Sequence, residues 1–437
     1  MVFARTFAAR GIAAIGSLVL IVILGRLYGP TGVGILALTQ GVLLGASVFA
    51  KYGMDNGLMR FIGQDQESIY IYKLLSWTLI FVFVLSLIIA LAIFFGRDNI
   101  EIMFQSKGLS SVLVGISIAT PAYALGYILS GFFKGIRKPA TACLMEGGSV
   151  ALVSAFIILL INLFDPAFGI ASIGVAYAIA TWLVLAQGIL YIYNRYAVTA
   201  HNKYHICKIE FKHLKSSFIS SSHDFFIMNL ATLVQSTISI LIAGWLLTSS
   251  ELGLFKSSEQ TAMLISFVLI VINAILPPRF AHLFNQGKLH ELELLGRQGA
   301  RFGILLASPL IIACLFFPYW VLGIIGEDFK DAAPLLQILG IAQLINLATG
   351  SVGFMLSMTG HERIMRNISW ISSIIGILLL FLLIPLFSAI GAAVSLAVIL
   401  ITQNLIALYF VWKKLGIWML PIPNLFRLAG IEPQDNK

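Results

Sequence analysis

Residues 71–95 read IYKLLSWTLIFVFVLSLIIALAIFF, and residues 371–387 read ISSIIGILLLFLLIPLF. A helix needs roughly 20 apolar residues to cross the hydrocarbon core of a bilayer. The apolar residues of these runs do not alternate with polar ones, as they would along the strands of a membrane barrel. Because only helices and closed barrels satisfy the backbone in lipid, both runs predict membrane-spanning helices.

The whole chain has the composition of an all-α polytopic membrane protein. Of its 437 residues, 59% are hydrophobic and 11% are charged, whereas soluble domains carry about 25% charged residues. Residues 1–27 lack a small-residue cleavage site, so no cleavable signal peptide is expected. Apolar runs predict about twelve spans, at residues 7–27, 33–52, 71–96, 109–132, 142–164, 169–194, 217–247, 257–277, 302–325, 333–358, 367–387 and 389–412.

The net charge of +9 follows from an uneven distribution of Lys and Arg. The N-terminus, the even-numbered loops and the C-terminus hold most of these residues. The positive-inside rule therefore predicts that both termini are cytoplasmic. Since topology accounts for the basic balance, we expect no nucleic-acid partner. The opposite side holds only Arg26, Arg97, Lys107, Lys256 and Lys330.

The chain repeats itself. Residues 21–61 align with residues 240–280 without a gap, and this pairs Arg60 with Arg279. Six spans per half is an even number, so both halves enter the membrane in the same direction. Transporters use such parallel repeats to build a central site. We predict an N-terminal six-helix lobe at 1–198, a cytoplasmic linker at 199–215 and a C-terminal six-helix lobe with a short cytoplasmic tail at 216–437.

Ionisable side chains within spans cost ~2.5–3.5 kcal/mol each on insertion scales and usually face a cavity. Cations at the cytoplasmic mouth are interpreted either as an anion site, because guanidinium donates in a bidentate fork to phosphate, or as topology signals. Carboxylates are interpreted either as carriers of a coupling H⁺ or Na⁺ or as partners that neutralise a nearby cation. The cation candidates are Arg10, Arg60, Lys134 and Arg279, and the carboxylate candidates are Asp55, Glu146, Asp224 and Glu259.

Several features favour a structural role over chemistry. Lys256 and Glu259 are three residues apart on one helix face, a spacing that favours an ion pair. His223 is interpreted as an interface residue, with a proton relay as the alternative. Gly25, Gly45 and the pair Gly147 and Gly148 predict close helix packing. The three cysteines, Cys143, Cys207 and Cys314, lack metal-ligand spacing. The sequence also shows no metal cluster and no pairing of a nucleophile with a base, so we expect no metal, no cofactor and no catalytic residue.

Four segments carry a resemblance to a known family: 24–38 (LGRLYGPTGVGILAL), 52–63 (YGMDNGLMRFIG), 131–140 (GFFKGIRKPA) and 173–180 (IGVAYAIA). Together they resemble the polysaccharide flippases of the Wzx type, or O-antigen repeat-unit translocases. That family belongs to the superfamily of multidrug, oligosaccharidyl-lipid and polysaccharide exporters.

The resemblance implies a two-lobed, V-shaped fold with a central cavity and alternating access in the bacterial inner membrane. The implied cargo is an oligosaccharide on undecaprenyl pyrophosphate, moved to the periplasmic leaflet, with an ion gradient as the drive. Cationic cavity residues would hold the pyrophosphate. Polysaccharide polymerase machinery is a further partner to expect.

Three alternatives remain open. A multidrug cation antiporter of the same superfamily would need acidic cavity residues, and the first span has no carboxylate. A lipid II flippase usually has two extra spans. A membrane glycosyltransferase or polymerase would need a large outer loop or a pair of catalytic carboxylates, and the outer loops here are short.

Overall fold

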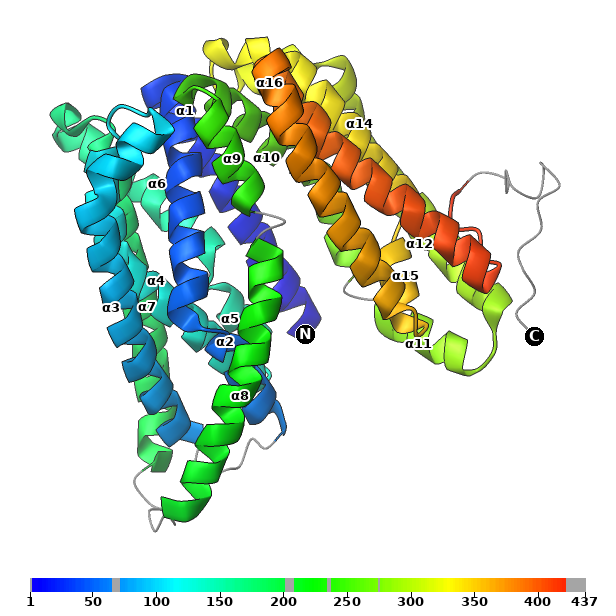
Figure 1. Ribbon diagram of the computed structural model, residues 1–437, viewed down its shortest axis with the longest axis horizontal. Coiled ribbons are helices and arrows are strands. Elements are labelled where there is room, and N and C mark those ends of the chain that lie inside the picture. The colour runs from blue at the N-terminus through cyan, green and yellow to red at the C-terminus, as the bar shows by residue number, and fades with distance from the viewer. Residues whose placement is uncertain (1, 65–70, 201–207, 234–236, 274–275, 422–437) are drawn as a thin grey trace. The chain divides into compact units, whose positions relative to one another are not determined.

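The computed structural model describes residues 2–64, 71–200, 208–233, 237–273 and 276–421, and every regular element in these ranges is helical (Figure 1). The chain forms two compact units, which we call unit 1 (Met1–Ser250) and unit 2 (Glu251–Lys437). The all-α membrane fold is confirmed. The predicted linker at 199–215 stays a prediction, because residues 201–207 lie outside the described ranges.

Unit 1 is built around α4 (Leu109–Gly135), which packs against α1, α2, α3 and α7 and is buried along most of its length. Small residues allow this close contact: a Cβ on Gly115 would lie 2.1 Å from the backbone of Gly174 in α7. The elements of unit 1 are α1 (Val2–Lys51), α2 (Met54–Gln64), α3 (Ile71–Phe104), α4, α5 (Pro139–Cys143), α6 (Gly147–Phe164), η1 (Pro166–Phe168), α7 (Ala171–Ala200), α8 (Lys208–Leu233) and α9 (Ser239–Leu246).

Unit 2 begins within α10 (Ser249–Asn273), because the first residues of this helix still belong to unit 1. Its helix α14 (Ala333–Thr349) ends at Gly350, where φ is +67°, and α15 (Val352–Met358) continues after this break. By order in the chain α14 corresponds to α4, which is unbroken. The other elements are α11 (Leu276–Asn285), α12 (Leu289–Phe316), α13 (Pro318–Gly323), η3 (Glu327–Ala332) and α16 (Glu362–Leu415).

Eight helical stretches in the described part of the chain are long and apolar enough to cross a membrane. Two of these helices contain a bend between two predicted spans: α1 bends at Gly29, where φ is +62°, and α16 bends at Ser388, where φ is +49°. The predicted spans 217–247 and 257–277 are not among the eight. The first is divided between α8 and α9, and α10 carries Glu251, Lys256 and Glu259 in its first half. The total of twelve therefore stays a prediction.

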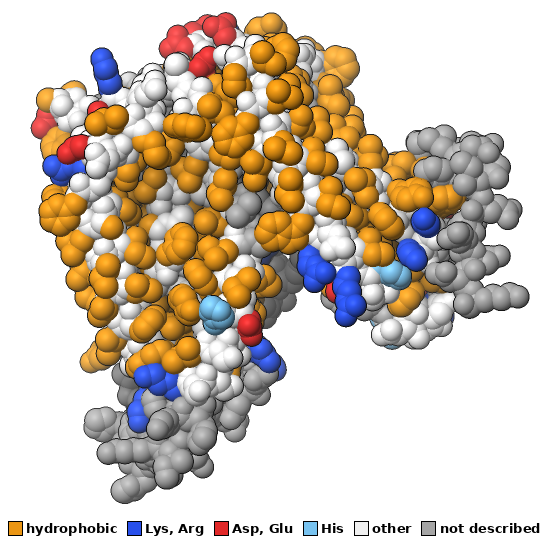
Figure 2. Space-filling model, in the orientation of Figure 1, with side chains coloured by type: hydrophobic (Ala, Val, Ile, Leu, Met, Phe, Trp, Pro, Cys, Tyr) orange, Lys and Arg blue, Asp and Glu red, His pale blue; other side chains and the backbone are white. Residues whose placement is uncertain are grey.

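The surface has the polarity of a protein embedded in lipid. Hydrophobic side chains cover most of the body of each unit on the face seen in Figure 2, and charged side chains gather near the ends. Large apolar side chains such as Phe95, Phe164, Leu305 and Phe316 are mostly exposed. Exposed apolar area on this scale marks a surface that is covered by something other than water, here the hydrocarbon core.

The predicted repeat has a local counterpart in each unit. A short amphipathic helix follows the second predicted span of each half: α2 has 11 residues and contains Arg60, and α11 has 10 residues and contains Arg279. The aligned arginines thus occupy the same kind of element. Both units contain this short helix, although α14 ends at Gly350 and its counterpart α4 is unbroken.

Two of the glycine predictions have opposite outcomes. A Cβ on Gly148 would lie 2.2 Å from the Cβ of Ala13, which confirms close packing of α6 on α1. The prediction for Gly45 is wrong, because no atom of the described residues lies within 4 Å of the position that a Cβ would take there. Sequence alone does not tell which face of α1 meets a neighbour.

Candidate functional site

The candidate site is a cavity of about 350 Å³ within unit 1, which we call the unit 1 cavity. Helices α1, α4, α5, α6 and α7 line it, and its lining contains ionisable, amide and phenol side chains that lie within the predicted spans. Polar side chains within spans usually mark substrate or ion pathways. The lining residues are Arg10, Ala13, Ser17, Gln40, Leu43, Leu44, Tyr123, Tyr127, Cys143, Glu146, Gly147, Gly148 and Tyr177.

Arg10 and Glu146, two of the predicted site residues, lie in this cavity. Arg10 is exposed, and no ion pair or hydrogen bond joins it to another residue in the described ranges. Glu146 stands at the start of α6, where its carboxylate accepts a hydrogen bond from Ser130 Oγ at 2.8 Å. The carboxylate also pairs with Lys134 Nζ at 2.6 Å.

Among Arg10, Lys134 and Glu146, Arg10 is the residue whose charge is not balanced by an ion pair in the described ranges. Lys134 and Glu146 neutralise each other, so the predicted role of Lys134 as a free anion ligand has a competing partner in the structure. Gly147 and Gly148 in the first turn of α6 also line the cavity, and no side chain caps that end of the helix. Uncapped N–H groups at a helix start carry partial positive charge.

A second ion pair lies next to a residue that lines the cavity. Lys51 Nζ is 2.8 Å from Asp55 Oδ2, and both side chains are nearly buried, with 9% and 12% of their surface exposed. Lys51 Nζ also lies 4.3 Å from the ring centroid of Tyr127, which lines the cavity. Asp55 was a predicted site residue, but Lys51 was not, although its spacing of four residues from Asp55 is visible in the sequence.

Arg60 lies outside the unit 1 cavity, exposed on α2. Helix α2 is enclosed by α4 and α8. A Cβ on Gly131 of α4 would lie 2.2 Å from the Asp55 carbonyl oxygen, and one on Gly53 would lie 2.3 Å from the Ser222 carbonyl oxygen. The glycines of segments 52–63 and 131–140 therefore fit these helices together, so both segments have a packing role.

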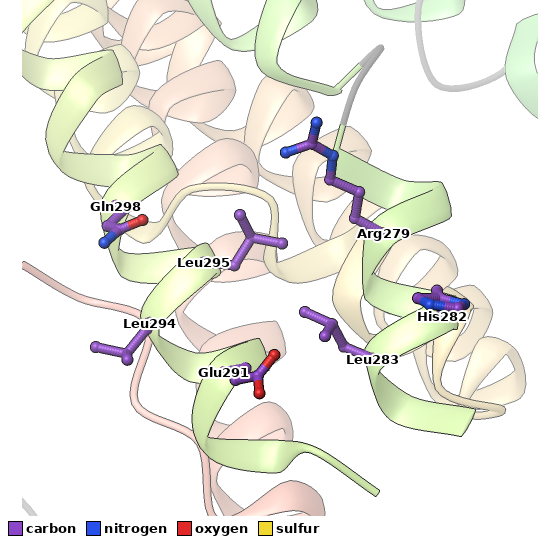
Figure 3. Close-up of a pocket in the computed structure, with 7 residues that line it drawn as sticks. All are labelled: Arg279, His282, Leu283, Glu291, Leu294, Leu295 and Gln298. Carbon is purple, nitrogen blue, oxygen red and sulfur yellow. The ribbon is translucent and has the colours of Figure 1, made fainter. Parts of the chain in front are cut away.

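Arg279 lies in unit 2, in a separate pocket of about 590 Å³ (Figure 3). Figure 3 shows Arg279, His282 and Leu283 of α11 on one side and Glu291, Leu294, Leu295 and Gln298 of α12 on the other. No ion pair joins Arg279 to Glu291 among the residues described for this unit. The pocket contains charges of both signs and is lined otherwise by leucines, one imidazole and one amide.

The remaining predicted residues lie elsewhere. Glu259 pairs with Lys256 at 2.7 Å, which confirms the expected ion pair. His223 and Asp224 are exposed on α8. His223 Nδ1 lies 2.7 Å from the hydroxyl of Tyr52 at the turn between α1 and α2, in agreement with its predicted interface role.

Sequence reasoning missed the uncharged polar groups. In unit 1 these are the phenols and the amide of the cavity, where Gln40 Nε2 donates to the Tyr177 hydroxyl at 2.7 Å. In unit 2, Asn346 Nδ2 donates to Gln343 Oε1 at 3.1 Å, and Ser351 Oγ donates to Asn273 Oδ1 at 2.5 Å beside the break in α14. Polar residues on separate apolar helices give no local sequence signal.

Two family models match the chain. The model described as polysaccharide biosynthesis protein matches residues 3–284, and the model described as MatE matches residues 225–382. The first match covers more than half of the chain.

Relatives in other organisms match shorter stretches. Capsular polysaccharide biosynthesis protein CapF of Staphylococcus aureus is 26% identical over 165 residues, which are 38% of this chain and 41% of CapF. The membrane protein MJ1068 of Methanocaldococcus jannaschii is 28% identical over 137 residues, which are 31% of this chain and 27% of MJ1068. The matched segments thus span less than half the length of either relative.

Solved structures of similar fold cover nearly the whole chain. The lipid II flippase MurJ, in an inward closed conformation, has a TM-score of 0.70 at 14% identity, with 93% of this chain and 87% of MurJ covered. An inward-facing multidrug resistance transporter of the MATE family has a TM-score of 0.68 at 12% identity, with 92% and 94% covered. At these identities the likeness concerns the fold.

Proposed function

Because the chain belongs to the polysaccharide biosynthesis protein family, a family of membrane transporters and flippases, we propose that it flips a lipid-linked oligosaccharide. The proposed cargo is an oligosaccharide repeat unit on undecaprenyl pyrophosphate. It moves from the cytoplasmic to the periplasmic leaflet of a bacterial inner membrane by alternating access. The observation that carries the proposal is Arg10, a cation in the unit 1 cavity without an ion-pair partner among the described residues.

The chemistry of the cavity suits a pyrophosphate. An anion without compensating charge is strongly disfavoured at membrane depth. The guanidinium of Arg10 supplies a full positive charge and a bidentate donor fork. The first turn of α6, which lines the same cavity at Gly147 and Gly148, adds partial positive charge. Since Glu146 is paired with Lys134, the group as a whole keeps a positive excess.

Deletion of the gene tests this function. In a strain without a redundant flippase, we expect lipid-linked repeat units to accumulate in the cell and surface polysaccharide to be lost. Normal surface polysaccharide in that strain contradicts the proposal.

The deletion strain also isolates the role of Arg10. We expect Arg10→Gln to restore less than about a tenth of the polysaccharide that the wild-type chain restores, since the lost interaction is charge-assisted. Arg5→Gln is the control, because Arg5 is an exposed arginine on the same helix that does not line the cavity. Equal restoration by both variants contradicts a role for Arg10.

For the drive we propose a coupling H⁺ or Na⁺ gradient. Glu146 and Asp55 are the better placed carboxylates, because Glu146 lines the cavity and Asp55 connects to it through Lys51 and Tyr127. Cargo flipping in proteoliposomes should then accelerate when either a pH or a Na⁺ gradient is imposed. Flipping at the same rate under both gradients and without any gradient contradicts coupling.

A multidrug cation antiporter is the second candidate function, and the MatE match at residues 225–382 favours it. A cationic drug would require a negative excess in its cavity, whereas Glu146, the carboxylate that lines the unit 1 cavity, is already paired with Lys134. Growth of an overexpressing strain on a panel of cationic drugs separates the two candidates. Raised resistance together with normal surface polysaccharide in the deletion strain favours the antiporter.

A further inference from the structure

The unit 1 cavity also contains uncharged polar side chains, which the pyrophosphate proposal does not explain. Tyr123, Tyr127 and Tyr177 line it together with Gln40. We propose that these four side chains form a subsite for one sugar ring, the ring bonded directly to the pyrophosphate. This inference rests on the proposed function and adds a saccharide specificity to it.

Gln40 and Tyr177 supply hydrogen bonds that suit sugar hydroxyls. Gln40 Nε2 donates to the Tyr177 hydroxyl at 2.7 Å, which orients both groups. A primary amide has a second N–H and an acceptor oxygen, and a phenol that accepts a hydrogen bond keeps its own hydrogen to donate. Tyr177 is buried, with 3% of its surface exposed, so these groups meet a ligand away from bulk water. Sugar hydroxyls both donate and accept, and they match this neutral set.

Tyr123 and Tyr127 supply flat rings with polar tips. Their ring centroids are 5.2 Å apart in an edge-to-face arrangement, and their hydroxyl oxygens are 3.5 Å apart. An aromatic ring presents an apolar body and, in tyrosine, a polar end. A pyranose has the same two properties, with C–H faces and a rim of hydroxyls.

Glycine at position 147 lets the Tyr123 hydroxyl lie close to the start of α6. A Cβ on Gly147 would lie 2.9 Å from the Tyr123 hydroxyl oxygen. Gly147 lines the cavity, so even a methyl group there would crowd the space next to the ring hydroxyls.

The size and position of the subsite select a single ring. Ligand pockets commonly measure about 300–1,000 Å³, and the 350 Å³ of this cavity lie at the small end. Arg10 lines the same cavity, so a pyrophosphate at Arg10 would place the sugar bonded to it next to the phenols. The Arg279 pocket of unit 2, by comparison, has no aromatic residue among those that line it, apart from the imidazole of His282.

Direct binding to two lipid probes tests the subsite. Purified full-length protein in nanodiscs is titrated with undecaprenyl pyrophosphate, and separately with undecaprenyl pyrophosphate that carries one sugar, in a series with glucose, galactose and N-acetylglucosamine. We expect wild type to bind at least one sugar-bearing lipid about tenfold more tightly than the sugar-free lipid, the gain expected from one or two hydrogen bonds. Gln40→Leu and Tyr177→Phe should reduce this affinity ratio to about one.

Tyr28→Phe is the matched control. The Tyr28 hydroxyl lies 3.0 Å from Ser172 Oγ and, like the bond between Gln40 and Tyr177, joins α1 to α7. Tyr28 does not line the cavity. The control variant should therefore keep the affinity ratio of wild type.

The outcomes separate the two proposals. If wild type binds the sugar-free lipid and every sugar-bearing lipid equally well, the subsite is refuted while the pyrophosphate site stands. If Tyr28→Phe lowers the ratio as much as Tyr177→Phe does, the effect comes from helix packing and the subsite is refuted. If wild type binds none of the lipids, the proposed function fails, and the subsite fails with it.

Discussion

Lys51 and Asp55 are oppositely charged side chains that unit 1 removes from solvent together. At a separation of 2.8 Å each charge compensates the other, although Asp55 Oδ1 has no hydrogen-bond partner in the described part of the chain. The desolvation penalty of a buried pair is repaid only while both partners are present. Removal of one partner leaves an uncompensated charge, so the pair must behave as a unit.

We predict strong coupling between substitutions of this pair. Lys51→Met should destabilise the protein by about 3 kcal/mol, and adding Asp55→Asn should recover part of that loss. Thermal unfolding in detergent measures both. The same cycle on the pair of Lys330 and Glu327, whose side chains are 42% and 81% exposed, should change stability by less than about 0.5 kcal/mol. Additive losses at Lys51 and Asp55 contradict the coupling.

Single residues differ in how well the sequence predicts their role. Arg10 and Glu146 were predictable as cavity candidates, because an ionisable residue within an apolar run is costly and needs a polar environment. The engagement of Lys134 with Glu146 was not predictable, since these residues lie on α4 and at the start of α6, and only packing decides their distance.

Helix α2 shows how glycines determine the distance between helices in unit 1. It lies between α4 and α8, and glycines meet it from both directions. Gly131 allows the backbone of Asp55 to approach α4, and Gly53 allows the turn before α2 to approach α8. Small residues serve this purpose in membranes because helix association there depends on van der Waals contact.

We predict that Gly131→Ala weakens the contact between α2 and α4. The added Cβ would lie 2.2 Å from the Asp55 carbonyl oxygen, and overpacking of this kind costs about 1–3 kcal/mol. Gly45→Ala is the control, since no atom in the described part of the chain lies within 4 Å of its Cβ position and alanine gains up to about 1 kcal/mol in a helix. The unfolding temperature should fall for the first variant and stay level or rise for the second. A fall of equal size in both would contradict the packing.

A second prediction concerns the docking of α8. At Gly53 φ is +70°, and a Cβ would also lie 2.3 Å from the Ser222 carbonyl oxygen. At Gly108 φ is +91° and no described residue has an atom within 4 Å of the Cβ position. Gly108→Ala therefore carries only the backbone strain of about 1–2 kcal/mol. Hydrogen exchange should accelerate in residues 215–230 for Gly53→Ala and not for Gly108→Ala. Unchanged exchange in Gly53→Ala contradicts the contact.

At the scale of the whole molecule, the charge distribution predicts which ends of the helices face the cytoplasm. Ser111 at the start of α4 and Gln286 after α11 are exposed and lie at ends predicted to be on opposite sides. With the native cysteines replaced by serine, an impermeant maleimide should label Ser111→Cys in intact cells. It should label Gln286→Cys only after the membrane is opened. The reverse pattern would invert the predicted orientation.

The sequence by itself determined that the chain is an all-α membrane protein and which ionisable residues lie within its spans. These properties are local. About twenty consecutive apolar residues suffice to predict a membrane span, and an ionisable residue among them is rare enough to be recognised. Only the tertiary structure decided that Gln40, Tyr123 and Tyr177 line one cavity with Arg10 and that Lys51 is paired within unit 1. Those side chains come from three helices far apart in the chain, and their meeting depends on small residues that set how closely the helices pack.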